Sequence, residues 1–203
     1  MLLQPFAIAL TPSVIRKAAL SGLFPMGGDE GGFGWYFAEP RGMLPVEGIR
    51  KNRSLARALR LQRFRHSFDR DFEQVLLSCR RPKDNWIGPE IVEAYLEIHE
   101  EGWGHSSEVW LGDRLVGGVY GVAIGGLFCA ESMFHCEPEA GKIALWHLVE
   151  ECRGQGFIAF DVQTMTRHLS WLGGFQVSHV EYLGLVHEAV ATRTEWGDGP
   201  FQT

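Results

Sequence analysis

The sequence has no apolar run long enough to cross a membrane, because a spanning helix needs about 20 consecutive apolar residues. Residues 1–10 are apolar, but they lack the basic start and the small-residue cleavage site of a secretory signal. Cysteine is scarce, and no two cysteines have C-x-x-C spacing, so zinc and a disulfide framework are not expected. We therefore expect a cytoplasmic protein without membrane contact or metal. The cysteines are Cys79, Cys129, Cys136 and Cys152.

An excess of basic charge is also missing, since 25 acidic and 19 basic residues give a net charge of −6. Residues 50–65 are the exception, because they contain basic residues and no acid. A helix here would carry Arg53, Arg57 and Arg60 on one face. Such a pattern is ordinarily a solvated helix face. Like charges four residues apart repel, however, which favours an anionic partner such as a phosphate backbone. The basic residues are Arg50, Lys51, Arg53, Arg57, Arg60, Arg63 and Arg65.

Two carboxylates and an amide interrupt apolar, strand-like runs in the second half of the chain. Glu131 lies within Phe128–Phe134, and Asp161 and Gln163 follow about thirty residues later. Burying a carboxylate costs several kcal/mol unless a cation or hydrogen-bond donor meets it. Each group could simply satisfy nearby backbone donors. Together they predict the polar floor of a pocket that receives a cation.

The chain is long enough for one or two small domains with a sizeable core. Its patterning predicts an α/β (α+β) fold, in which antiparallel strands are followed by a helix, another strand and further helices. Strands are expected at 107–111, 114–124, 126–134, 157–162 and 175–178. Helices are expected at 13–21, 54–64, 69–79, 89–101, 137–153, 164–172 and 181–191.

That order resembles the layout of GNAT acetyltransferases, so acyl-CoA is a candidate substrate. Those enzymes open the central helix with an Arg/Gln-x-x-Gly-x-Gly/Ala turn, whose backbone N–H groups hold the pyrophosphate. Here the expected central helix begins with the acidic segment Glu137–Lys142 and has no such turn. An acyl-CoA-dependent N-acyltransferase is therefore an alternative function that this segment opposes.

Several short segments occur together in a consistent order. They are Gly22-Leu-Phe-Pro-Met26, Trp35–Pro45, Asn85-Trp-Ile87, His105-Ser-Ser-Glu-Val-Trp110, Leu115–Val122, Glu131-Ser-Met-Phe134, Asp161-Val-Gln163 and His168-Leu169. In this order and spacing, the chain resembles the leucyl/phenylalanyl-tRNA–protein transferases over residues 13–185. Several positions depart from the family pattern. They include Ala130 before the Glu-Ser-Met-Phe run, where Gly is usual, Val162, where Cys or Thr is common, and Met26-Gly27, where many members carry Trp-Tyr and a subgroup carries Met.

The resemblance implies a small N-terminal domain, assigned to residues 1–62, and a GNAT-like catalytic domain over residues 63–203 with a mixed, largely antiparallel sheet. It implies transfer of Leu or Phe, and of Met less well, from aminoacyl-tRNA to the α-amine of proteins beginning with Arg or Lys. That transfer marks the acceptor for degradation. No cofactor is implied, and we expect a monomer. A non-catalytic adaptor that binds basic N-termini is a second alternative.

The residue chemistry suggests roles for the candidate site. Asp161 and Glu131 would hold the acceptor's cation, while Gln163 orients the amine or the ester carbonyl. The stretch from Arg50 to Arg63 would contact tRNA phosphates. An apolar slot would accept the donor side chain; for its members, plain core packing is the competing explanation, and it is favoured for Tyr120 and Met133. The candidates for the slot are Trp86, Phe128, Met133, Trp35 and Tyr120.

Overall fold

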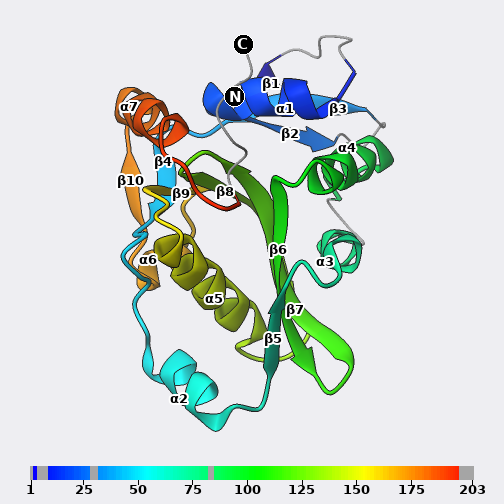
Figure 1. Cartoon of the computed structure of the whole chain (residues 1–203), viewed down its shortest axis with the longest axis vertical. Coiled ribbons are helices and arrows are strands. Elements are labelled where there is room, and N and C mark those ends of the chain that lie inside the picture. Colours follow the sequence, from blue (N-terminus) through cyan, green and yellow to red (C-terminus); the bar gives the residue numbers. More distant parts are fainter. Residues whose placement is uncertain (1, 4–8, 28–31, 82–84, 197–203) are drawn as a thin grey trace.

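Two β-sheets organise the computed structural model, which describes residues 2–3, 9–27, 32–81 and 85–196. The small sheet has the order β1-β3-β2 and packs beside helix α1 (Figure 1). Pro12 occupies the first turn of α1, where its missing N–H costs nothing. The elements are β1 (Leu2–Leu3), α1 (Pro12–Leu20), β2 (Leu23–Gly27) and β3 (Phe33–Phe37).

The large sheet has seven strands in the order β10-β4-β9-β8-β7-β6-β5. Only β8 and β9 pair in parallel; the other neighbours are antiparallel. A mixed, largely antiparallel sheet is thus confirmed. The strands are β4 (Arg41–Leu44), β5 (Arg65–Phe68), β6 (Gly104–Leu111), β7 (Arg114–Ile124), β8 (Leu127–His135), β9 (Ala159–Gln163) and β10 (Phe175–Val177).

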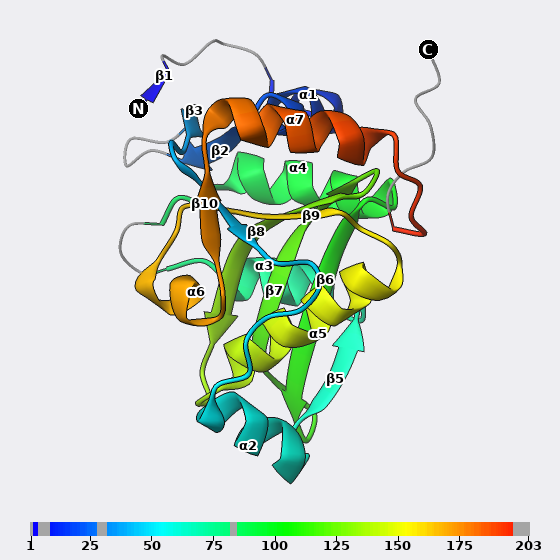
Figure 2. The ribbon, with the colours of Figure 1, turned by 90° about the vertical axis from the view of Figure 1, so that its left-hand side faces the viewer.

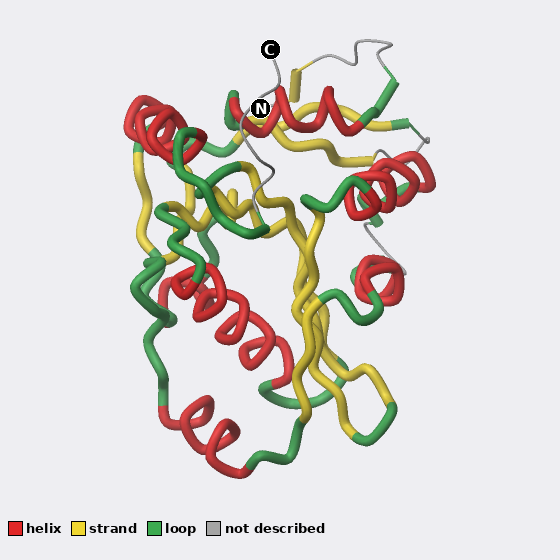
Figure 3. The backbone as a smooth tube through the Cα atoms, in the orientation of Figure 1, coloured by secondary structure: helices red, strands yellow, loops and turns green. Residues whose placement is uncertain are grey.

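Helices cover both faces of the large sheet, with α5 on one face and α3 and α4 on the other (Figure 3). One apolar cluster lies on each face, so the sheet divides the core in two. Seen from the side, α7 crosses one end of the molecule and α2 lies at the opposite end (Figure 2). The helices are α2 (Arg53–Leu61), α3 (Phe72–Ser78), α4 (Pro89–Glu100), α5 (Ala140–Gly154), α6 (Arg167–Trp171) and α7 (His179–Val190).

The elements predicted from patterning are present, with shifted ends. The helix expected from Ser54 begins at Arg53, because the Asn52 side chain accepts a hydrogen bond from the Leu55 amide and caps it. The domain boundary at residue 62 stays a prediction. In the structure β4, which precedes that boundary, is a strand of the large sheet between β10 and β9.

Candidate active site

The candidate site lies where two parallel strands separate. β8 and β9 pair over three positions only, ending at Cys129 opposite Asp161. Beyond that point β8 continues beside β7, while β9 ends at Gln163 beside β4. A cleft of about 350 Å³ opens at the separation, and we call it the Glu131 cleft. Its lining comes from β2, β7, β8, α5, α6, the end of β9 and the segments before α4.

A β-bulge turns Glu131 toward this cleft. Tyr120 pairs with Ser132 and Gly121 pairs with Ala130, so Glu131 is the extra residue on β8. Gly121 makes the bulge possible, because a Cβ at this position would lie 2.2 Å from the carbonyl oxygen of Cys129. The ladder is therefore broken at the residue whose carboxylate faces the cleft.

Glu131 and Gln163 form the polar floor of the cleft. The Gln163 amide donates a hydrogen bond from Nε2 to Glu131 Oε2 at 2.9 Å. Both residues are 9% exposed and line the cleft. Burial, followed by the charge of Asp161, raises the pKa of Glu131 to about 7, while the hydrogen bond from Gln163 and the charge of Arg41 oppose that rise. Glu131 therefore changes charge near neutral pH.

Asp161 lies behind the floor and is 0% exposed. Its carboxylate accepts two hydrogen bonds from Arg41, Nε to Oδ1 at 2.8 Å and Nη2 to Oδ2 at 2.5 Å. It also accepts the Tyr182 hydroxyl at 2.9 Å and the backbone N–H of Gln163 at 2.7 Å. The cation that the sequence predicted for this acid is thus supplied by the chain itself.

Arg41 is the site residue that sequence reasoning missed. It is 3% exposed, its guanidinium carbon lies 5.3 Å from the Phe24 ring centre and 4.7 Å from that of Tyr182, and Nη1 donates to the Gly22 carbonyl. Burial opposes its charge, but the charge and hydrogen bonds of Asp161 outweigh burial and raise the pKa of the guanidinium. The signal was available, because Arg41 begins a run that is otherwise apolar.

Gln163 is held in an uncommon backbone conformation, with φ +57°. That left-handed geometry is costly for a residue with a Cβ and persists only where surrounding contacts impose it. Two contacts do so here. The backbone N–H of Gln163 donates a hydrogen bond to the Asp161 carboxylate. Gly42 lets the turn after Gln163 approach closely, because a Cβ at position 42 would lie 2.9 Å from the Met165 nitrogen.

The five residues predicted for the donor slot separate into two groups. Trp86 and Met133 line the cleft, together with Phe24, Met26 and Leu169. Among the described cleft-lining residues, Phe128, Tyr120 and Trp35 are absent. Phe128 stacks on Phe160 in the core beside α5, Tyr120 meets Tyr95 edge-on in the other core, and Trp35 belongs to that second cluster through β3. Their placement favours core packing.

The predicted phosphate contact lies on and around α2, at one end of the molecule (Figure 1). Arg53, Arg57 and Arg60 are exposed, and no described acid pairs with them. Others in the set have partners: Arg63 forms an ion pair with Glu137 at 3.0 Å, and the ammonium of Lys51 lies 4.6 Å from the Trp146 ring centre. Arg50 is exposed and donates its backbone N–H to Leu172.

Local contacts connect α2 to the mouth of the cleft. The Ser54 hydroxyl donates to Glu139 at 2.9 Å, and Lys142 donates to the same carboxylate at 2.8 Å. His168, which lines the cleft, has its pKa lowered by burial and then by the charge of Lys142. The start of α5 therefore lies between α2 and the cleft-lining residue His168.

Neither a metal centre nor a membrane span is evident in the part of the chain that the structure describes. Within those ranges, no group of three or more His, Cys, Asp or Glu side chains could hold a metal ion. No described helix has both the length and the apolar character needed to span a bilayer.

Comparison with known proteins identifies the family. Residues 43–187 match the model described as leucyl/phenylalanyl-tRNA protein transferase. A protein of that name from Rubrobacter xylanophilus is 39% identical, with 89% of this chain and 95% of the relative covered. Relatives of the same name from Ruegeria sp. and Chlorobium luteolum are both 41% identical, covering 90% and 89% of this chain and 88% and 95% of theirs.

The chain is an aminoacyltransferase. It belongs to the leucyl/phenylalanyl-tRNA protein transferase family, as its motifs predicted. A solved structure titled "The structure of L-PGS from Bacillus licheniformis" has a TM-score of 0.45 at 13% identity, covering 84% of this chain and 67% of that one. That likeness is too weak to support a statement about this site.

Proposed function

We propose that this chain transfers Leu or Phe, and Met less well, from the 3′ end of aminoacyl-tRNA to the α-amine of proteins that begin with Arg or Lys. The product would be marked for degradation. One observation supports this most directly: the Glu131–Gln163 pair, at 2.9 Å, lies in a cleft that also contains Trp86 and Met133. An acid, an amide and an apolar wall thus lie together, as a basic acceptor and an apolar donor require.

The proposed reaction needs alignment more than it needs a strong base. The amine nitrogen attacks the ester carbonyl carbon, the C–N bond forms, and the C–O bond to the tRNA ribose breaks. The amine's proton leaves with the ribose oxygen or through solvent. The donor ester is already activated, and roughly a tenth of an α-amine with pKa 7.7–8.0 is neutral at pH 7. Holding both reactants in line can supply about 7–11 kcal/mol.

In our proposal Glu131, rather than Asp161, meets the acceptor's cation. The Asp161 carboxylate is fully buried and already accepts hydrogen bonds from Arg41, Gln163 and Tyr182, so Asp161 acts as a positioning residue through Gln163. Gln163 keeps its side-chain oxygen and one N–H for the amine or the ester carbonyl, because only one amide N–H is donated to Glu131. Glu131 would thus bind the acceptor's cation, and Gln163 would orient the amine or the ester carbonyl.

Trp86 and Met133 would form the donor slot. β2 positions Trp86, because the Gly27 N–H donates to the Trp86 carbonyl at 2.7 Å. An apolar slot discriminates one methylene by only ~1–3 kcal/mol, which is why Met transfer is expected beside Leu and Phe. We expect Trp86→Ala to raise KM for charged tRNA, with Trp171→Ala as a matched control. Trp171 is 56% exposed and does not line the cleft.

The tRNA would lie across α2, where phosphates meet Arg53, Arg57 and Arg60. Recognition of this kind is largely independent of sequence and weakens as salt rises. We also propose a GNAT-like architecture for the sheet and helices around the cleft. Its support is the order of antiparallel strands, then α5, then a parallel β9 that separates from β8.

The decisive experiment incubates the purified chain with radiolabelled Leu-tRNA or Phe-tRNA and a peptide beginning with Arg, beside one beginning with Gly. Label on the Arg peptide alone is the expected result. Absence of label from a folded protein overturns the proposal. Acetyl transfer when acetyl-CoA replaces the tRNA would then favour the CoA alternative, whereas Arg-peptide binding without any transfer would favour an adaptor.

A further inference from the structure

A second cavity lies on the far side of β9 from the Glu131 cleft. It has a volume of about 500 Å³ and lies between α7 and the strands β4, β9 and β10. We call it the acidic groove. Its floor is apolar and includes Met43, Leu44 and Phe160, all of them buried. Figure 2 faces this side of the molecule, with β10 and β4 in front and α7 above them.

Apolar side chains also remain exposed at the groove. Phe175 on β10 is 45% exposed and Ile158 before β9 is 42% exposed. β10 is the last strand in the sheet order, so no described strand covers its outer edge. Large apolar side chains that stay exposed around a hollow indicate a binding surface more often than scattered single ones do.

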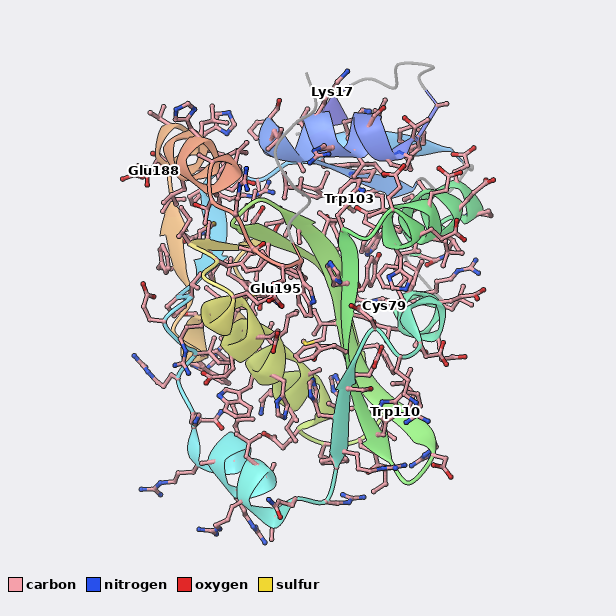
Figure 4. The ribbon with its side chains drawn as sticks, in the orientation of Figure 1. Lys17, Cys79, Trp103, Trp110, Glu188 and Glu195 are labelled. Atoms are coloured by element: carbon pink, nitrogen blue, oxygen red, sulfur yellow. The ribbon has the colours of Figure 1, made fainter. Side chains whose placement is uncertain are left out.

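The rim of the groove carries acidic side chains. Glu47 and Glu188 are exposed, and no described cation pairs with either carboxylate. Glu188 projects outward from α7 (Figure 4). Glu181 adds a third carboxylate, which accepts hydrogen bonds from Ser178. A negative rim over an apolar floor is complementary to a chain that combines basic and apolar residues.

A third cavity, which we call the passage, lies beside the last strand of the sheet. Thr164 lines both the Glu131 cleft and this cavity of about 420 Å³, whose other lining includes Glu39 and Gln176. Gln176 lies on β10 between Phe175 and Val177, which line the acidic groove, so its side chain points to the opposite face of the strand from the groove. A polypeptide that leaves the cleft through the passage would therefore cross the outer edge of β10 to reach the groove.

The distance along β9 sets the shortest possible length of the route from the cleft to the groove. Ala159 lines the groove and Gln163 lines the cleft, so the two are four residues apart, about 13 Å along the strand. An extended chain covers about 3.3–3.6 Å per residue, and the detour around β10 adds to the path. Six to eight residues, roughly, would span from one site to the other.

We propose that the acidic groove binds the acceptor polypeptide downstream of its N-terminus. The inference rests on the proposed function, since it assumes that the acceptor's first residue occupies the Glu131 cleft. The following residues run through the passage, and apolar and basic side chains near positions six to eight occupy the groove. The groove thereby selects acceptors with an extended, basic and apolar leader over those with an acidic one.

The test compares acceptors of two lengths on the same enzyme. An Arg-Ala dipeptide is measured beside a ten-residue peptide that begins with Arg-Ala and carries Lys and Leu at positions six to eight. A second ten-residue peptide carries Glu and Ser at those positions. In the wild-type chain the Lys/Leu peptide is expected to show a KM about tenfold below that of the dipeptide, and the Glu/Ser peptide is expected to show no such gain.

The double variant Glu47→Lys with Glu188→Lys removes the rim charge. The ratio of kcat/KM for the Lys/Leu peptide to that for the dipeptide is expected to fall about tenfold. Phe175→Asp is expected to lower the same ratio, because it removes an exposed apolar side chain from the lining of the groove. Glu93→Lys with Glu97→Lys is the matched control, because it changes the net charge equally at exposed positions of α4, a helix that does not line the groove.

Equal KM values for long and short acceptors in the wild-type chain would overturn the proposal, as would ratios that change equally in groove and control variants. A groove variant that alters self-association in sedimentation, and leaves the ratio unchanged, would assign the surface to a second copy instead. Failure of the proposed function is a different result, because it abolishes transfer to the dipeptide itself.

Discussion

The ionisation of Glu131 makes one contribution to how stability depends on pH. Its pKa is about 7 in the folded chain, against an ordinary 4.5, with burial as the main cause. The folded state therefore holds a proton between those values that the unfolded state has released, so the contribution of Glu131 to stability falls as pH rises from about 4.5 to 7. The full effect is at most about 3 kcal/mol. Because glutamine does not ionise, Glu131→Gln is expected to remove this loss, so that the unfolding free energy measured in urea at pH 8 rises relative to that at pH 5 when compared with the wild-type chain. An unchanged difference would contradict the assignment.

Asp161 is expected to contribute to the stability of the fold as well as to transfer, because its carboxylate pairs with the buried Arg41 guanidinium. Asp161→Asn leaves the Arg41 guanidinium buried with weakened partners, so we expect a loss of about 3–5 kcal/mol together with the loss of transfer. Tyr182→Phe is the matched comparison, since it removes one hydrogen bond to the same carboxylate and should cost about 1 kcal/mol. Thermal unfolding of both variants measures the difference. Equal midpoints would show that the ion pair does not hold this region together.

At the level of single elements, the bulge in β8 depends on one glycine. A Cβ at position 121 would approach the Cys129 carbonyl to 2.2 Å and the Phe128 ring to 2.6 Å, and both neighbours are buried. Gly121→Ala should therefore destabilise the fold by roughly 1–3 kcal/mol and reduce transfer by displacing Glu131. Gly154→Ala at the end of α5 is the control, because nothing lies within 4 Å of its Cβ position. Equal activity in the two variants would refute this role for the bulge.

Helix α2 is a second single element with a proposed role, because its exposed arginines would contact tRNA phosphates. Arg57→Glu with Arg60→Glu should raise KM for charged tRNA about tenfold or more, without changing the unfolding midpoint, because neither side chain has a described ionic partner. The slope of log KM against log salt should fall by about 2, one for each arginine that no longer neutralises a phosphate. Transfer kinetics with charged tRNA over a salt series measure it. An unchanged slope would move the tRNA away from this helix.

Local pattern was enough to predict several features. Alternation and turn residues indicated the hairpin of β6 and β7, and the polar groups in apolar runs indicated that Glu131 and Gln163 belong to one site. Arg41 was not recognised, because its partner is 120 residues away and is brought to it by the pairing of β4 with β9. The bulge at Glu131 depends on register between strands. Whether Phe128 or Trp86 faces a cleft likewise depends on packing that no single segment encodes.

At the scale of the whole molecule, charge is separated despite the overall value of −6. Helices α2 and α7 lie toward opposite ends of the molecule (Figure 1). Exposed arginines without a described ionic partner lie on α2, whereas Glu47 and Glu188 border the acidic groove beside α7. The Glu131 cleft lies between them. A polyanionic donor and a basic acceptor would thus approach from opposite ends and meet at the separation of β8 and β9.

This arrangement predicts that the two charge clusters act independently. Combining Arg57→Glu and Arg60→Glu with Glu47→Lys and Glu188→Lys should give decreases in kcat/KM whose free energies add to within about 0.5 kcal/mol, as expected for sites with no shared partners. The measurement is a cycle of wild type, each double variant and the quadruple variant, with charged tRNA and the Lys/Leu peptide. Coupling well above that value would mean that donor and acceptor occupy a common surface, because each pair of substitutions would then alter the partner that the other pair binds.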